Sequence, residues 1–298
     1  MNIYGKHKGF DIDVPNAAQV LLSEDHFFSK ESNFLSECLH FRLVLDELWK
    51  TGTSQQLSDE QNSFLNQRIL HHRQNLTAAD IQNYPRSLCY IINEIAHDYF
   101  TLFGSPFLHF IASGGIFKII KGEVNRAYFQ TAIQVGSWYL DLANDAVLPQ
   151  NDKVKFCRLA DSGFSVISTL QQYIEVKQKY FHCELYANHL FPAIAPYFPL
   201  VMKKADGQWT IDNFTFIADL MIESQGQFSH GFCKEMPPED AQKILDKFQE
   251  KRDKNMFQPW TSPEKFPAEK LPETRQDLSQ EELQQMKLAT RYINFLLK

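Results

Sequence analysis

The residue of this sequence best suited to covalent chemistry is Cys89. It follows Pro85 by four positions, at the expected start of a helix whose apolar residues recur with helical spacing as far as Gly104. The free N–H groups and the dipole at a helix N-terminus stabilise a thiolate, which is the nucleophilic form of cysteine. Cys89 is therefore a candidate nucleophile; in the alternative interpretation it packs in the core as a small apolar side chain.

Short segments rich in aromatic and β-branched residues follow Gly104. They read FLHFIA, GIFKIIKG, RAYFQTAIQV and WYLDLA. This composition predicts strands, and Gly136-Ser137 between the last two segments predicts a tight hairpin turn. We expect an α+β protein that is mainly helical, with a small antiparallel sheet at about residues 107–143.

Residues 84–145 contain a pattern that resembles the core of the transglutaminase-like, papain-related family. In that family a helix that starts at the nucleophilic cysteine ends in a Gly-x-Pro turn, and strands carrying the histidine and the aspartate follow. Here the turn corresponds to Gly104-Ser105-Pro106, and Asp141 corresponds to the acid. The resemblance covers about a fifth of the chain and implies a transglutaminase-like core.

The resemblance implies a cysteine-dependent hydrolase or acyl-transfer enzyme that acts on an amide, isopeptide or thioester. Cys89 would attack and Asp141 would orient the base. Where the family has His-Ala-Trp, this sequence has Arg126-Ala127-Tyr128, and arginine does not serve as a base. His109, on an expected strand, is therefore the candidate base, with His97 as an alternative. Without either, the chain would be a catalytically inactive protein-interaction module of the same fold.

Asp141 has an alternative interpretation, and other acidic residues and histidines suggest a metal site. Asp141 could be a solvent-facing strand residue, because alternate strand positions face solvent. The pair Glu94-x-x-His97 has the spacing of carboxylate-bridged di-iron proteins, which suggests a metal-dependent, non-haem iron oxygenase. The supplementary ligands for this site would be Glu175, His182 and His189, which share one face of an expected helix at 164–191. Separately, His182-x-Glu184 resembles the His-x-carboxylate half of a mononuclear iron facial triad, with His230 as the third ligand.

Glu184 has a separate interpretation within the expected helix. Its position falls in the apolar arc of that helix, and a buried carboxylate needs a partner. It would therefore form a structural ion pair or act as a functional acid. Our favoured hypothesis, the cysteine hydrolase, needs no metal and no cofactor.

Composition limits the class of partner and the compartment. A net charge of −6 without a block of Lys or Arg argues against nucleic acid as the main partner, so a protein or a small molecule is expected. The five scattered cysteines indicate free thiols. The apolar runs are too short to span a membrane, and the start lacks a secretory pattern, so we expect a cytoplasmic protein.

The C-terminal residues carry a cue of a different kind. Glu281-Glu282 and the apolar residues that end the chain resemble the tail of type IV secreted bacterial effectors, which would place the protein in a host cytosol. The same residues could equally form an ordinary amphipathic packing helix.

Three regions are expected along the chain. Residues 1–83 form a helical N-terminal segment, residues 84–200 the α+β core, and residues 201–298 helical additions with a proline-rich strap at 255–278. Periodicity and capping boxes at Ser58 and Ser279 place the remaining helices. Those helices are expected at 32–49, 58–71, 212–223, 238–253 and from 279 onward.

Overall fold

The structure is a computed structural model of an α+β chain, and the part of it that can be described is not continuous. It describes residues 12–27, 31–191, 198–212 and 234–251, together with residues 195, 290, 293 and 294. The chain divides into two compact units, one of residues 8–166 and one that includes residues 167–298, so the division falls within the predicted α+β core. Each unit is described by itself. None of the described helices is long and apolar enough to cross a bilayer.

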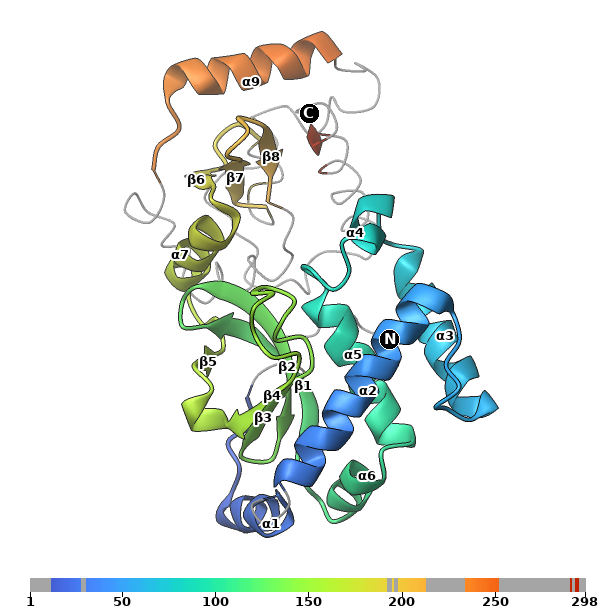
Figure 1. The fold of residues 1–298 in the computed structure, drawn as a ribbon. Helices are drawn as coiled ribbons and strands as arrows, with labels where there is room; N and C mark the ends of the chain where they lie inside the picture. The colour runs from blue at the N-terminus through green and yellow to red at the C-terminus, as the bar shows by residue number, and fades with distance from the viewer. Residues whose placement is uncertain are drawn as a thin grey trace, which may run out of the picture. The chain divides into compact units, whose positions relative to one another are not determined.

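The first unit contains helices and a five-stranded antiparallel sheet (Figure 1). Its helices are α1 (Ala17–Phe27), α2 (Glu31–Thr51), α3 (Asp59–Arg73), α4 (Ala78–Gln82), α5 (Cys89–Leu102) and α6 (Ser105–Ala112). Its strands are β1 (Phe117–Val124), β2 (Tyr128–Val135), β3 (Trp138–Asp141), β4 (Lys155–Arg158) and β5 (Phe164–Ser165), in the order β4-β3-β2-β1-β5.

Local sequence signals explain the first helices. The buried residues of α2 recur with helical spacing, as predicted for 32–49. Helix α3 begins at a capping box in which the Ser58 side chain accepts from the Gln61 backbone and the Gln61 side chain accepts from the Ser58 backbone. Both predictions are confirmed.

The hairpin of β2 and β3 also follows from local sequence. Val135 pairs with Trp138, so the loop consists of Gly136 and Ser137 alone. Gly136 has φ +60°, a conformation that glycine adopts without steric cost and that two-residue hairpin turns require. The predicted turn is confirmed.

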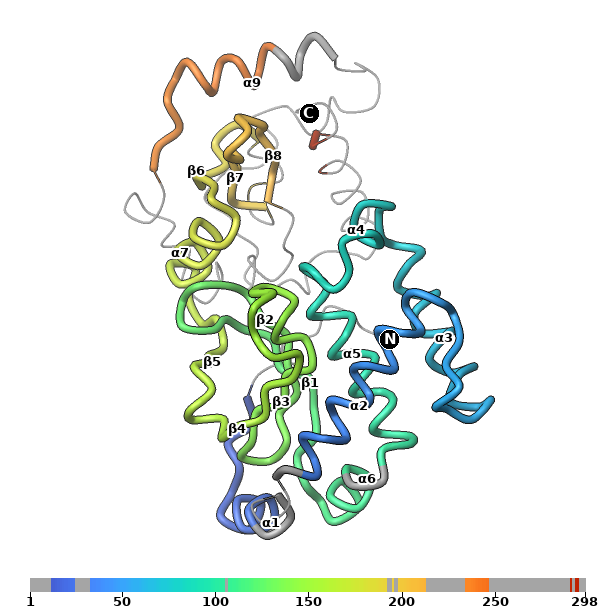
Figure 2. Tube along the Cα trace, viewed as in Figure 1, coloured from blue at the N-terminus to red at the C-terminus, as the bar shows by residue number. Residues whose placement is uncertain are grey.

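The segment FLHFIA was predicted as a strand, and this prediction is wrong. It forms helix α6, which begins after Gly104 with a proline in its first turn. Phe107 and Phe110 are buried and Leu108 and His109 are exposed, a three-residue spacing that a strand cannot produce. The tube in Figure 2 follows the chain from α5 through α6 into β1. The sheet therefore begins at Phe117, and β4 and β5 extend it beyond residue 143.

Each face of the sheet has its own apolar cluster. Helix α5 packs on β1 and β2, and α2 packs on α5 through Phe41, whose ring centroid lies 4.9 Å from that of Phe100. Ile133, Val135 and Leu140 contribute to the cluster on the α5 side. The cluster on the opposite face consists of Ile120, Val124, Ala132, Tyr139 and Phe164.

The single helix predicted at 164–191 is wrong, because part of this range forms a strand in the second unit. Helix α7 (Leu170–Phe181) ends at His182, whose φ of +49° is left-handed, and strand β6 (Glu184–Ala187) follows. Strand β6 pairs with β7 (Leu200–Lys203), which pairs with β8 (Trp209–Ile211). Strand β6 has four residues, of which Leu185, Tyr186 and Ala187 are buried, and a pattern this short cannot compete with the helical pattern in the sequence.

The last predicted elements are only partly described. Helix α9 (Pro238–Lys251) confirms the prediction for 238–253. The predicted helix at 212–223 lies outside the described residues from residue 213, and the predicted strap at 255–278 lies outside them entirely. Of the predicted helix after Ser279, only residues 290, 293 and 294 are described, and these are helical.

Candidate functional site

Cys89 is the first residue of α5, as predicted, and its thiol faces β2. Burial raises the pKa of this thiol to about 11; interactions with the backbone and side chain of Thr131 and the backbone of Tyr90 oppose the rise, and the Asp141 charge adds to it. Helix α5 has no side-chain cap at Leu88. Burial, the largest cause of the shift, therefore favours the protonated thiol.

Asp141 ends strand β3 and is 1% exposed, so it is not the solvent-facing residue of the alternative interpretation. Its carboxylate accepts hydrogen bonds from Asn93 Nδ2 at 3.0 Å and from the Ala143 N–H at 2.8 Å. Gln130 Nε2 and the Tyr139 hydroxyl also donate to it. Burial raises the pKa of Asp141, and these donors oppose the rise. The carboxylate is thus satisfied inside the protein.

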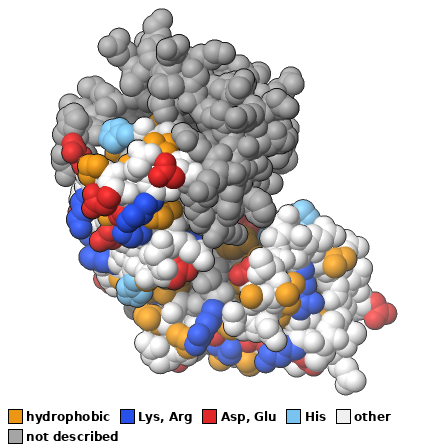
Figure 3. Space-filling view, turned by 90° about the horizontal axis from the view of Figure 1, so that it is seen from above, with side chains coloured by type: hydrophobic (Ala, Val, Ile, Leu, Met, Phe, Trp, Pro, Cys, Tyr) orange, Lys and Arg blue, Asp and Glu red, His pale blue; other side chains and the backbone are white. Residues whose placement is uncertain are grey.

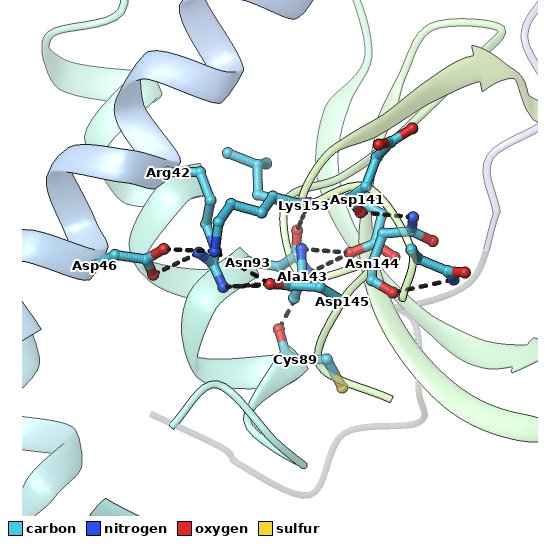
Figure 4. Close-up of polar contacts among 12 residues, drawn as sticks. Arg42, Asp46, Cys89, Asn93, Asp141, Ala143, Asn144, Asp145 and Lys153 are labelled. Atoms are coloured by element: carbon cyan, nitrogen blue, oxygen red, sulfur yellow. Dashed lines mark hydrogen bonds and ion pairs between the residues drawn. The ribbon is translucent and has the colours of Figure 1, made fainter. Parts of the chain in front are cut away.

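Asn93 connects Cys89 to Asp141, and the sequence analysis did not single it out. Its Nδ2 lies 3.1 Å from the Cys89 carbonyl oxygen, 2.8 Å from that of Thr131 and 3.0 Å from Asp141 Oδ1. Its Oδ1 accepts from the Leu142 N–H at 3.0 Å. Figure 4 shows Asn93 between the other two side chains. The sequence signal that could have pointed to Asn93 is its amide side chain four residues after Cys89, on the same face of the helix.

The two histidines considered as bases lie elsewhere. His109 is exposed on α6, beyond the C-terminal end of α5, and the 14 residues of α5 span about 20 Å from Cys89 to that end. His97 lies two turns along α5, where its ring stacks on Phe117 with centroids 5.1 Å apart. The structure therefore brings Cys89 and Asp141 together and leaves His109 at the other end of the helix.

Arg126, which the resemblance in the sequence aligned with a catalytic histidine, lies in the turn between β1 and β2. It has φ +53°, and its backbone N–H donates to the carboxylate of Glu123. The β2 residue that contacts the Cys89 thiol is Thr131. A threonine hydroxyl is not a general base at neutral pH, so this position supplies no proton acceptor for the thiol.

A second buried polar group lies beside the first. Arg42 of α2 is fully buried, and its NH2 lies 3.1 Å from Asp145 Oδ1 while its NH1 contacts Asp46. Lys153 Nζ lies 2.8 Å from Asp46 and 3.3 Å from Asp145 (Figure 4). The guanidinium carbon is 5.6 Å from the centre of the Tyr84 ring. The two cations balance the charges of the two carboxylates, and such pairing is what allows charged side chains to be buried. These four side chains hold α2 against the chain after β3.

The residues of the proposed metal centre have other partners. Glu94 pairs with Lys121 at 3.0 Å, and His182 ends α7. Glu184 is exposed on β6 and accepts from the Tyr186 hydroxyl, so the prediction that it points into the apolar arc of a helix is wrong. Within the described residues, no group of three or more His, Cys, Asp or Glu side chains could hold a metal ion. His230 lies outside those residues.

The surface charges and the comparisons with known proteins do not assign a function to this site. In the coloured part of the face drawn in Figure 3, Lys and Arg side chains are interspersed with Asp and Glu. The chain matches no protein-family model, no curated protein and no solved structure.

Proposed function

We propose that this chain is a protein-interaction module with a transglutaminase-like arrangement that carries out no cysteine chemistry. The observation that carries the proposal is the environment of Cys89. Among the described residues, Thr131, Tyr90 and Asp141 affect its pKa, and no histidine is one of them.

The physical argument concerns the ionised fraction of the thiol. With a pKa of about 11, roughly one thiol in ten thousand is a thiolate at pH 7. A cysteine enzyme raises that fraction with an adjacent base or cation. Here the neighbouring charged group is Asp141, a carboxylate that disfavours the thiolate.

Alkylation of the native protein tests the proposal. Iodoacetamide is added at pH 7.4 and at pH 9.5, and the modification of each cysteine is followed by mass spectrometry. We expect the alkylation of Cys89 at pH 7.4 to be more than tenfold slower in the native protein than in urea. The alkylation of native Cys89 should be faster at pH 9.5 than at pH 7.4. Rapid modification of native Cys89 at pH 7.4, faster than that of Cys157, which is half-buried like Cys89, would contradict the proposal.

A second candidate is the cysteine-dependent hydrolase or acyl-transfer enzyme. The observation in its favour is that Asn93 donates both to the backbone carbonyl of Cys89 and to the carboxylate of Asp141, the two residues that would hold two of the three family roles. The test compares the wild-type protein with Cys89→Ala and with the control Cys157→Ala on fluorogenic amide and thioester substrates. Turnover that disappears only in Cys89→Ala would establish this candidate and exclude the first.

A further inference from the structure

Ile12 and Asp13 lie on the face of the sheet opposite α5. The side chain of Ile12 packs against the apolar cluster of that face. The members of this cluster come from β1, β2, β3 and β5, and they are Ile120, Val124, Ala132, Tyr139 and Phe164. This face therefore holds an apolar side chain from a piece of chain that is in neither a helix nor a strand.

Gln134 recognises the backbone of the next residue, Asp13. Its Oε1 accepts from the Asp13 N–H at 2.9 Å, and its Nε2 donates to the Asp13 carbonyl oxygen at 2.7 Å. Nε2 also donates to the Gly136 carbonyl oxygen at 3.0 Å, and the Gln134 side chain is fully buried. One amide side chain thus satisfies both backbone groups of a single residue, as a neighbouring strand does when it binds a peptide. This recognition depends on an extended backbone and not on a particular side chain.

Lys118 adds a preference for an acidic side chain at the same position. Its Nζ lies 2.8 Å from Asp13 Oδ1, and the Asp13 side chain remains 54% exposed. An ion pair with such exposure is weak in water. The pair therefore selects an acidic residue without holding it permanently.

Helix α1 is attached to the sheet by separate contacts. Glu24 accepts two hydrogen bonds from Arg158, at 2.6 and 2.7 Å, and the Ser137 N–H lies 3.3 Å from Ser23 Oγ. These contacts do not involve Ile12 or Asp13. Ile12 and Asp13 can consequently leave the sheet without breaking the contacts that hold α1.

We propose that this surface is a peptide-binding site, which Ile12 and Asp13 occupy in the free chain and which an extended partner segment takes over. The partner segment carries an apolar residue followed by Asp or Glu. This inference rests on the proposed function as an interaction module and names its partner class. Because the chain's own segment competes at an effective concentration of about millimolar, binding to the wild-type protein is weak.

The test uses full-length protein and a fluorescein-labelled peptide of residues 9–16, GFDIDVPN. In the release variant, Ile12→Asp with Asp13→Lys, the chain's own segment loses its apolar contact and is repelled by Lys118. Fluorescence polarisation should show at least tenfold tighter peptide binding to this variant than to the wild type. Circular dichroism checks that the variant is folded; if it is not, Asp13→Lys alone provides the same comparison through one partly exposed side chain.

Charge exchange at Lys118 tests the geometry of the site. In the background Ile12→Asp with Asp13→Asn, in which position 13 is uncharged and does not pair with residue 118, Lys118→Glu should weaken binding of GFDIDVPN at least fivefold, and a peptide with lysine in place of the second aspartate should recover it. Absence of binding to every folded variant, or binding that ignores the charge at position 118, overturns the inference. The Cys89 alkylation test is independent: slow alkylation without peptide binding removes this inference alone, and fast alkylation with peptide binding removes only the proposed function.

Discussion

Asn93 donates its side-chain amide to the Asp141 carboxylate across 3.0 Å, and this bond joins helix α5 to strand β3 inside the protein. The same side chain accepts from the Leu142 N–H and donates to the Thr131 carbonyl oxygen. Asn93 therefore satisfies buried polar groups of two strands at once. The hydrogen bond between Asn93 and Asp141 also sets the position of Asp141 relative to Cys89, so it is central to the candidate site.

Asn93→Ala should lower the free energy of unfolding of the first unit by about 2–4 kcal/mol, because several buried polar groups would lose a partner. Urea denaturation followed by circular dichroism measures the change. The control is Asn75→Ala, in which an exposed amide is removed and a change below about 0.5 kcal/mol is expected. Equal effects of the two substitutions would show that the Asn93 network does not stabilise the fold.

His72 should make stability depend on pH. It is half-buried at the end of α3, with its ring 6.4 Å from that of Tyr90. Burial is the main cause that lowers the pKa of His72; Arg68 and His71 lower it further, and Glu94 and Asp98 oppose them. A lowered pKa means that His72 binds a proton more readily in the unfolded chain than in the folded protein. The contribution of neutral His72 to the free energy of unfolding is therefore fully present above the ordinary pKa of 6.5, and it is lost as the pH falls through the pKa of the folded protein.

The measurement is the free energy of unfolding between about pH 7.5 and pH 5.5, where histidine titrates. His72→Phe should flatten the decline toward low pH relative to the wild type. The control, His71→Phe, alters an exposed ring in the same turn and removes only a minor cause of the His72 shift, so it should flatten the decline less than His72→Phe does. An unchanged profile in His72→Phe would assign the pH dependence to other groups.

Lys177 should be essential for the second unit. Its Nζ lies 3.1 Å from Asp212 Oδ1, and both side chains are almost fully buried. The Tyr173 hydroxyl donates to the other carboxylate oxygen at 2.6 Å. Lys177→Met leaves a buried carboxylate without its cation and should destabilise this unit by about 3–5 kcal/mol.

Thermal unfolding followed by tryptophan fluorescence and circular dichroism measures this loss. Lys179→Met, on the exposed side of the same helix, is the matched control and should change stability by less than about 0.5 kcal/mol. The double variant Lys177→Met with Asp212→Asn should recover part of the loss, because no buried charge remains. A double variant that is no more stable than Lys177→Met would contradict the ion-pair explanation.

Gly136→Ala should destabilise the first unit more than Gly114→Ala. Both glycines have positive φ, at +60° and +84°, so each substitution costs about 1–2 kcal/mol in the left-handed conformation. A Cβ at Gly136 would also lie 2.5 Å from Ser23 Oγ, whereas a Cβ at Gly114 meets nothing within 4 Å. We expect about 1–3 kcal/mol of additional loss at Gly136 from this overlap. Denaturant midpoints of the two variants compare them directly.

The sequence by itself determined the features whose hydrogen bonds and apolar contacts are local. Helix α2, the capping box at Ser58, the start of α5 at Cys89 and the two-residue turn at Gly136 were all predicted correctly. Each depends on residues within a few positions of one another, so composition and spacing are sufficient.

Tertiary structure alone decided the features that depend on distant residues. The segment FLHFIA became α6 because Phe107 and Phe110 pack against the same core as Phe100, although its composition favours a strand. Strand β6 exists because β7 pairs with it. Short apolar segments are compatible with either state, and the partner supplied by the fold selects one.

The candidate site shows the same division. Cys89 and Asp141 became candidates through the resemblance to a known family, whereas their connection through Asn93 required strands and a helix to meet. His109 was placed beside them in the sequence analysis, and the length of α5 places it at the other end of that helix. The bonds from Gln134 to Asp13 join residues 121 positions apart. Buried polar groups must find partners, but only the folded chain determines which ones.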